Sequence, residues 1–195
     1  MAKRDARLRL NAQIAFTNPS TTHAPSCPLI WDLRDPPATA AQPVPTYPSH
    51  PPYSSHPQPR PPTAHKPHPA LPSEYATAPP VRALNITCGL APAWKITAQN
   101  PRGGGVTVAD VLRAVHAALH APLAHGEWAA LAGKQRARVA AAYEERWRGA
   151  ADPAGERMQG LRRVDALLGC TRFGGLIVAD GRGECVLSLT RNTMG

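Results

Sequence analysis

Proline is concentrated in one segment of this chain. Of the 23 prolines in its 195 residues, 16 lie between Pro36 and Pro80. Proline has no backbone N–H donor and a fixed φ, so a run this dense cannot build a helix or a sheet ladder. We therefore expect residues 37–80 to form a disordered insert, rich in proline and histidine and extended in polyproline-like conformations.

Short amphipathic strands are indicated on both sides of this insert. Residues 29–34 alternate, with Leu29, Trp31 and Leu33 on one side, and Pro36 ends the pattern. After Val81, alternation predicts strands at 84–88 and 94–98. Two apolar runs, 173–179 and 185–189, flank the hairpin signal Asp-Gly-Arg-Gly at 180–183, which predicts an antiparallel pair.

Two long helices are indicated between these strands. Thr107 is placed as an N-cap, with Asp110 three residues later as the partner of a capping box. The helix that follows, to about His120, carries an apolar stripe at 108, 111, 112, 115 and 119. A short helical turn at 127–131, a second long helix at 135–147 and a loop at 149–160 complete the pattern. Together they predict an α+β fold: a small antiparallel or mixed sheet of about five strands packed against two main helices.

Composition bounds the compartment and the partners. The first 25 residues are polar and lack the apolar core of a signal peptide, so we expect a mobile N-terminal arm and an intracellular protein, cytoplasmic or nuclear and not secreted. No stretch reaches the ~20 apolar residues of a membrane span. The four cysteines form no C-x-x-C pair and are expected to be free thiols. The net charge of +9 permits an anionic partner without specifying one, and only 5% of residues are aromatic, which makes nucleic acid an unlikely partner.

Five short blocks also follow one another along the chain in a recognisable order: Trp31–Arg34, Pro92–Ile96, Gly105–Leu112, Arg162–Leu167 and Phe173–Leu176. Their sequence and order resemble a fungal, basidiomycete-type family, domain-of-unknown-function family 6699, over about residues 27–35 and 83–189. The resemblance implies that residues 27–36 and 81–192 form a single α+β domain and that the insert is an internal loop. It implies no catalytic residue.

Histidines provide the candidate metal ligands. His116 and His120 lie four residues apart on the first long helix, and His125 follows. The spacing resembles a zinc-binding H-E-x-x-H helix, but Ala117 stands where the general base would be. We therefore expect histidines at the edge of a helix and no metal, and keep the three as weak candidates. No nucleophile motif and no cofactor motif is present, so no catalytic residue and no cofactor is predicted.

The remaining charged and proline motifs favour interaction over chemistry. Arginines between 136 and 163 alternate with acids, which indicates an ion-paired surface, and Asp165 beside Arg162 and Arg163 is expected to anchor a turn. Lys66, Pro69 and Pro72 fit the K-x-x-P-x-x-P pattern of ligands for aromatic-lined grooves. The leading hypothesis is a non-enzymatic protein-interaction module whose partners dock on the proline-rich loop. A ligand-binding or enzymatic fold without a sequence signature, and polyanion or nucleic-acid binding through a basic face, stay open; the sequence does not indicate an oligomeric state.

Overall fold

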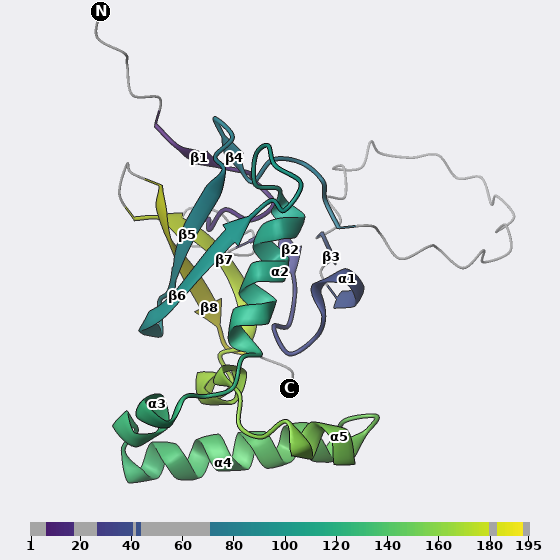
Figure 1. The fold of residues 1–195 in the computed structure, drawn as a ribbon, viewed down its shortest axis with the longest axis vertical. Helices are drawn as coiled ribbons and strands as arrows, with labels where there is room; N and C mark the ends of the chain where they lie inside the picture. Colours follow the sequence, from purple (N-terminus) through teal and green to yellow (C-terminus); the bar gives the residue numbers. More distant parts are fainter. Residues whose placement is uncertain (1–6, 18–26, 41, 44–70, 180–182, 193–195) are drawn as a thin grey trace, which may run out of the picture.

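The main sheet has four strands in the order β6-β5-β8-β7 (Figure 1). We describe it from a computed structural model, which covers residues 7–17, 27–40, 42–43, 71–179 and 183–192. The strands are β5 (Ala83–Cys88), β6 (Ala91–Gln99), β7 (Arg172–Val178) and β8 (Glu184–Thr190). Strands β5 and β6, and also β7 and β8, pair antiparallel, whereas β5 and β8 pair parallel. The sheet is therefore mixed, and the α+β prediction is confirmed.

Alternation places one face of this sheet in the core. Leu84, Ile86 and Cys88 of β5 are buried between more exposed neighbours, and the same holds on β6. On the other face Asn85 accepts a hydrogen bond from Thr97 of β6, 3.2 Å away. The predicted strands at 84–88 and 94–98 thus have the predicted inner faces.

Helix α2 (Val108–Leu119) covers the buried face next to β6. Its capping box forms as predicted: the Thr107 hydroxyl accepts from the amide of Asp110 at 3.2 Å, and the Asp110 carboxylate accepts from the amide of Thr107 at 3.0 Å. The whole predicted stripe is fully buried, namely Val108, Val111, Leu112, Val115 and Leu119. The local signals were sufficient here because cap and stripe both lie within one helix.

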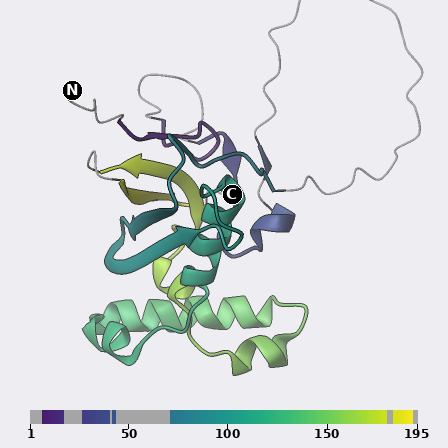
Figure 2. The same ribbon diagram turned by 45° about the horizontal axis from the view of Figure 1, so that its top comes forward.

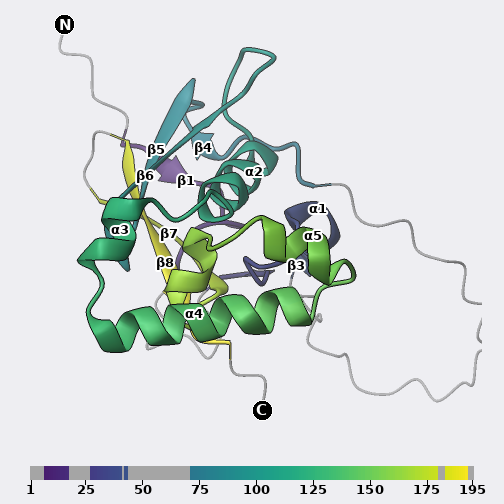
Figure 3. The same ribbon diagram turned by 60° about the horizontal axis from the view of Figure 1, so that its bottom comes forward.

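The helices that follow α2 form a layer at its C-terminal end (Figures 1, 2 and 3). They are α3 (His125–Ala130), α4 (Gly133–Arg148), α5 (Pro153–Met158) and the 3-10 helix η1 (Arg163–Leu167). The second long helix, α4, contacts η1 and α5. The sequence predicted a loop at 149–160, which is wrong where α5 forms. Asp152 accepts the amide of Gly155 as an N-cap, and Pro153 occupies the first helical turn, where proline is tolerated. Among the described residues, no helix is both long and apolar enough to cross a membrane.

The N-terminal segment differs from the mobile arm that we expected. Strand β1 (Arg9–Leu10) pairs antiparallel with β4 (Thr77–Ala78), and Ala15 forms a parallel bridge with Leu176 of β7. Ile14 is fully buried. These backbone contacts join residues distant in sequence, so a local pattern does not identify the partners.

The ends of the proline-rich segment also carry structure. Helix α1 (Pro37–Ala40) opens it, with proline at the first helical position, and β2 (Leu29–Ile30) pairs with β3 (Gln42–Pro43). At the other end Ala76 is buried and donates its amide to the carbonyl of Val106. The predicted bounds 37–80 were therefore too wide. The prolines between 44 and 70 lie outside the described residues.

The first testable consequence concerns Gly175, where β7 meets the N-terminal segment. Its φ is +106°, and an added Cβ would lie 2.8 Å from the backbone nitrogen and Cα of Phe16. We expect Gly175→Ala to lower the free energy of unfolding by about 1–3 kcal/mol through strain and steric overlap. Urea denaturation measures this. Gly126→Ala is the control, because a Cβ there meets nothing within 4 Å; equal stability of the two variants would contradict the prediction.

Candidate functional site

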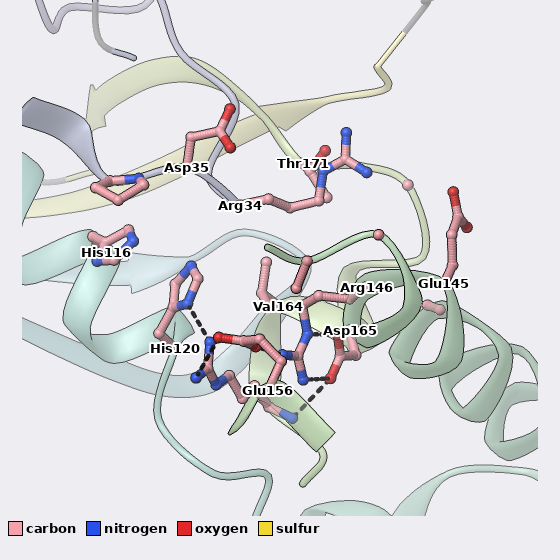
Figure 4. A pocket seen from close by; sticks show the side chains of 16 residues that line it. Arg34, Asp35, His116, His120, Glu145, Arg146, Glu156, Val164, Asp165 and Thr171 are labelled. Carbon is pink, nitrogen blue, oxygen red and sulfur yellow. Dashed lines mark hydrogen bonds and ion pairs between the residues drawn. The ribbon is translucent and has the colours of Figure 1, made fainter. Parts of the chain in front are cut away.

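A cleft of about 690 Å³ opens where the C-terminal end of α2 meets the layer of α4, α5 and η1 (Figure 4). The loop after β2 forms its other side. Its charged and imidazole-bearing lining residues are Arg34, Asp35, His116, His120, Glu145, Arg146, Glu156, Arg162 and Asp165. Residues far apart in the sequence therefore converge on one concave site.

Two stacked histidines of α2 form one wall. His116 and His120 are one helical turn apart, so they lie on one face, and their ring centroids are 4.0 Å apart. His120 Nε2 lies 2.9 Å from the carbonyl oxygen of Leu33, which can only accept a hydrogen bond, so Nε2 carries the proton. Nδ1 then accepts from Arg162 Nη1, 3.1 Å away. Both ring nitrogens of His120 are engaged, and the ring is neutral.

His116 is also held neutral, but one of its nitrogens has no hydrogen-bond partner among the described residues. Burial, followed by the nearby His120 and Arg162, lowers the pKa of His116 to about 4. Its Nε2 is buried and has no hydrogen-bond partner among the described residues. Burial likewise lowers the pKa of His120, and the hydrogen bond to Leu33 opposes that shift.

A buried ion-pair network forms the floor. Arg146, in the last turn of α4, binds Asp165 of η1 in a bidentate pair, with Nε–Oδ1 at 2.8 Å and Nη2–Oδ2 at 3.1 Å. Its Nη1 pairs with Glu156 of α5, and its Nη2 also donates to the carbonyl of Gly160. The Asp165 side chain is only 2% exposed and that of Arg146 only 11%. The guanidinium is thus saturated by groups of its own chain.

Arg162 connects this floor to the histidine wall. Its backbone amide donates to Asp165 Oδ2 at 2.9 Å, as expected of an aspartate that anchors a turn. Its side chain pairs with Glu156 and donates to Gln159 and His120. The network therefore joins α2, α4, α5 and η1, and its charges hold the fold together.

The rim of the cleft carries two carboxylates that take no part in the floor network. Asp35 lies in the loop after β2, and Glu145 lies on α4. No cation among the described residues is within ion-pair distance of either carboxylate. Arg34 lies nearby but bonds to Asp32, with Nη2–Oδ2 at 2.7 Å. That hydrogen bond, with a smaller contribution from the charges of Asp35 and Glu145, raises the pKa of Arg34 against the effect of burial.

The residues that the sequence suggested as metal ligands or docking residues lie in different parts of the structure. It brings His116 and His120 together, whereas His125 is exposed at the start of α3. No group of three potential metal ligands occurs in the part of the chain that the structure describes. Pro72 is half-buried and its carbonyl accepts the amide of Ala109, so it is tied to the first turn of α2. Lys66 and Pro69 lie outside the described residues.

The sequence indicated ion pairing among these arginines but not its burial. The turn in which Asp165 accepts the backbone amide of Arg162 lies within four residues and was readable. The bond between Arg146 and Asp165 spans 19 residues. Asp35 and Glu145, which form the rim, carry no pattern at all. Only the fold reveals that these residues share a site.

A mixed sheet, a capped covering helix and a polar cleft built on a helical layer define a small α+β domain. Residues 29–185 match the model of a family described as "Family of unknown function (DUF6699)", and the chain belongs to that family. Every residue that lines the cleft lies within the matched range. No curated protein and no solved structure matches the chain.

The neutral histidine predicts a pH dependence of stability. In the unfolded chain His116 takes up a proton near pH 6.5, whereas in the fold its pKa is about 4. Between these values the unfolded state binds more protons, so stability falls as the pH drops from 6.5 towards 4. We expect His116→Gln to flatten this decline in urea midpoints. The exposed His125→Gln is the control, and a decline of unchanged slope in His116→Gln would contradict the prediction.

Breaking the floor network is expected to be costly. Asp165→Asn leaves the buried Arg146 without its main counter-charge, so we expect a loss of about 3 kcal/mol in unfolding free energy. Glu144→Gln is the matched control, because the Glu144–Arg148 pair is at least half exposed and should change stability by less than about 0.5 kcal/mol. Thermal denaturation compares them; similar melting temperatures would show that the network contributes little.

Proposed function

We propose that this domain is a protein-interaction module whose cleft binds a partner segment through a basic side chain. The observation that carries the proposal is the pair of rim carboxylates, Asp35 and Glu145, which face a cleft whose inner charges are already neutralised by one another. A cationic side chain would be attracted to both carboxylates. His116 also lines the cleft, and its buried Nε2 has no hydrogen-bond partner among the described residues.

The charge of the cleft supports a basic ligand. Three guanidiniums (Arg34, Arg146, Arg162) and four carboxylates (Asp35, Glu145, Glu156, Asp165) line it, which gives a formal charge of 3 − 4 = −1. The chain as a whole carries +9. A negative site on a basic protein repels polyanions and selects cations. Polyanion binding through a basic face is the weaker proposal, because several of the arginines assigned to that face are in ion pairs, namely Arg146, Arg148, Arg162 and Arg163.

The state of the titratable groups supports binding over catalysis. General acid–base catalysis requires a free group whose pKa lies near the working pH. His116, with a pKa of about 4, is a weak base at neutral pH, and both nitrogens of His120 are engaged. Asp165 and Glu156 hold arginines in place. The groups best placed to move a proton are therefore committed or poorly matched.

The proline-rich segment offers a second contact for the same role. Its Lys66, Pro69 and Pro72 pattern fits an aromatic-lined groove of a partner. The segment begins at Pro37, next to Pro36, which lines the cleft. A fungal, intracellular setting and docking through this segment belong to the same proposal. Deletion of residues 44–70 leaves the structured ends intact, and loss of partners from that variant in a binding assay would support docking.

The cleft itself is tested with a charge-matched pair of peptides. We expect capped Gly-Arg-Gly, at millimolar concentration, to shift NMR amide signals around Asp35, Glu145 and His116. Capped Gly-citrulline-Gly, which keeps the shape but lacks the charge, should shift them at least fivefold less. Equal shifts from both peptides would reject recognition by charge.

Variants separate the cleft from general surface attraction. Combining Asp35→Asn with Glu145→Gln should weaken binding of the arginine peptide at least fivefold. Arg34→Gln removes the cation that sits beside the two carboxylates and should strengthen binding. Glu144→Gln, one residue away on α4 and paired with Arg148, is the control. Unchanged affinity in the double variant would overturn the proposal.

A further inference from the structure

The N-terminal segment, residues 7–17, lies on the fold as a strand-like ligand lies on a sheet edge. Its first part pairs with β4, Arg9 opposite Ala78 and Leu10 opposite Thr77. Its second part exchanges hydrogen bonds with β7: the Phe16 amide donates to the Leu176 carbonyl at 2.8 Å, and the Leu176 amide donates to the Ile14 carbonyl at 2.7 Å. This is the geometry by which extended peptides extend a sheet.

Side chains of the fold shape a groove for this segment. Ile14 is fully buried, and Leu8 and Leu10 pack against the core. The amide of the Asn11 side chain donates to the Glu74 carboxylate and to the Tyr75 carbonyl, each at 3.1 Å. At the bottom, Gly175 has no side chain, so the backbone at Phe16 can approach closely. Between its two paired parts the segment makes a turn, in which the amides of Ile14 and Ala15 donate to the carbonyl of Asn11. The groove therefore selects a chain that turns at this place and carries an apolar side chain at the position of Ile14.

The attachment of this segment is limited compared with the rest of the core. Ile14 is its only fully buried side chain, and its ladder with β4 has two residue pairs. It also lies outside the family match, which begins at residue 29, whereas β5, β6, β7 and α2 lie wholly within the match. A segment with so little buried surface is expected to open without unfolding the sheet.

We propose that β4 and the edge of β7 form a peptide-binding groove, distinct from the cleft, which residues 7–17 occupy in cis and from which they can be released. The groove fits a peptide of the pattern Leu-Asn-x-x-Ile-x-Phe, read from Leu10, Asn11, Ile14 and Phe16. Release of the segment exposes the unpaired edge of β7 and the site of Ile14. The groove is thus an interaction surface closed by a segment of its own chain.

Hydrogen exchange of the full chain tests the release. If the segment opens by itself, the amides of Phe16 and Leu176 exchange at least tenfold faster than those of the central strands β5 and β8. Both amides depend on the contact between the segment and β7. Exchange at the rate of the central strands would mean that the segment leaves only on global unfolding, and would overturn the proposal.

Binding in trans tests the groove, again in the full chain. Ile14→Asp places a charge at the buried position, whereas Ala12→Asp places the same charge at an exposed position of the same segment. We expect Ile14→Asp to bind a fluorescent peptide of residues 7–17 at least tenfold more tightly than wild type or Ala12→Asp does. A peptide that carries Ile14→Asp should not bind. A folded Ile14→Asp variant without affinity, or one that loses the whole sheet, would overturn the proposal.

Discussion

The bidentate pair between Arg146 and Asp165 is the contact on which the helical layer depends. Helix α4 is long but has little apolar surface to bury, and Val139 is its only buried residue. Such a helix cannot be held by a hydrophobic stripe alone. Instead, Arg146 reaches η1 through Asp165 and α5 through Glu156. These charges are largely shielded from water, so removing one partner leaves the others buried and unpaired. The packing of α4 against η1 and α5 therefore depends on the whole network.

The same network determines the electrostatics of the cleft. Arg162 pairs with Glu156, as Arg146 does, and its Nη1 donates to His120 Nδ1. The guanidinium disfavours a proton on either ring, which is one cause of the lowered pKa of both histidines. The inner surface is consequently balanced in charge, and unbalanced charge remains only at the rim. The network that holds the helical layer together thus leaves a cleft whose net charge has a defined sign.

The sequence was sufficient where a signal is local and repeated. Alternation located the inner faces of β5 and β6, and Thr107 with Asp110 located the start of α2, because each pattern lies within one element. It failed where a structure depends on single contacts between distant residues. The pairing of Arg9 with Ala78 joins residues far apart in the chain. Leu8, Leu10, Ile14 and Phe16 recur at even spacing, but that pattern does not say which strand the segment pairs with.

In the cleft, the shared helix face of the two histidines was predictable from the sequence, whereas the two rim carboxylates were not. His116 and His120 were found by helical spacing, but their environment depends on Leu33 and Arg162, which other elements supply. The Asp152-Pro153 pair indicated a loop and instead begins α5, since aspartate and proline are equally suited to a turn and to a first helical turn. That helix carries Glu156 into the network, so a local misreading concealed a member of the site.

The geometry of α2 bears on why the proline-rich insert is so long. Before the insert, α1 contacts α2; after it, the carbonyls of Pro72 and Glu74 accept from the first amides of the same helix. Twelve residues make α2 about 18 Å long, a distance that roughly six extended residues can cover. Residues 44–70 number 70 − 44 + 1 = 27. Closing a longer loop costs little extra free energy, so folding tolerates this length without requiring it. The connection of the two ends of the domain therefore does not account for the length of this segment.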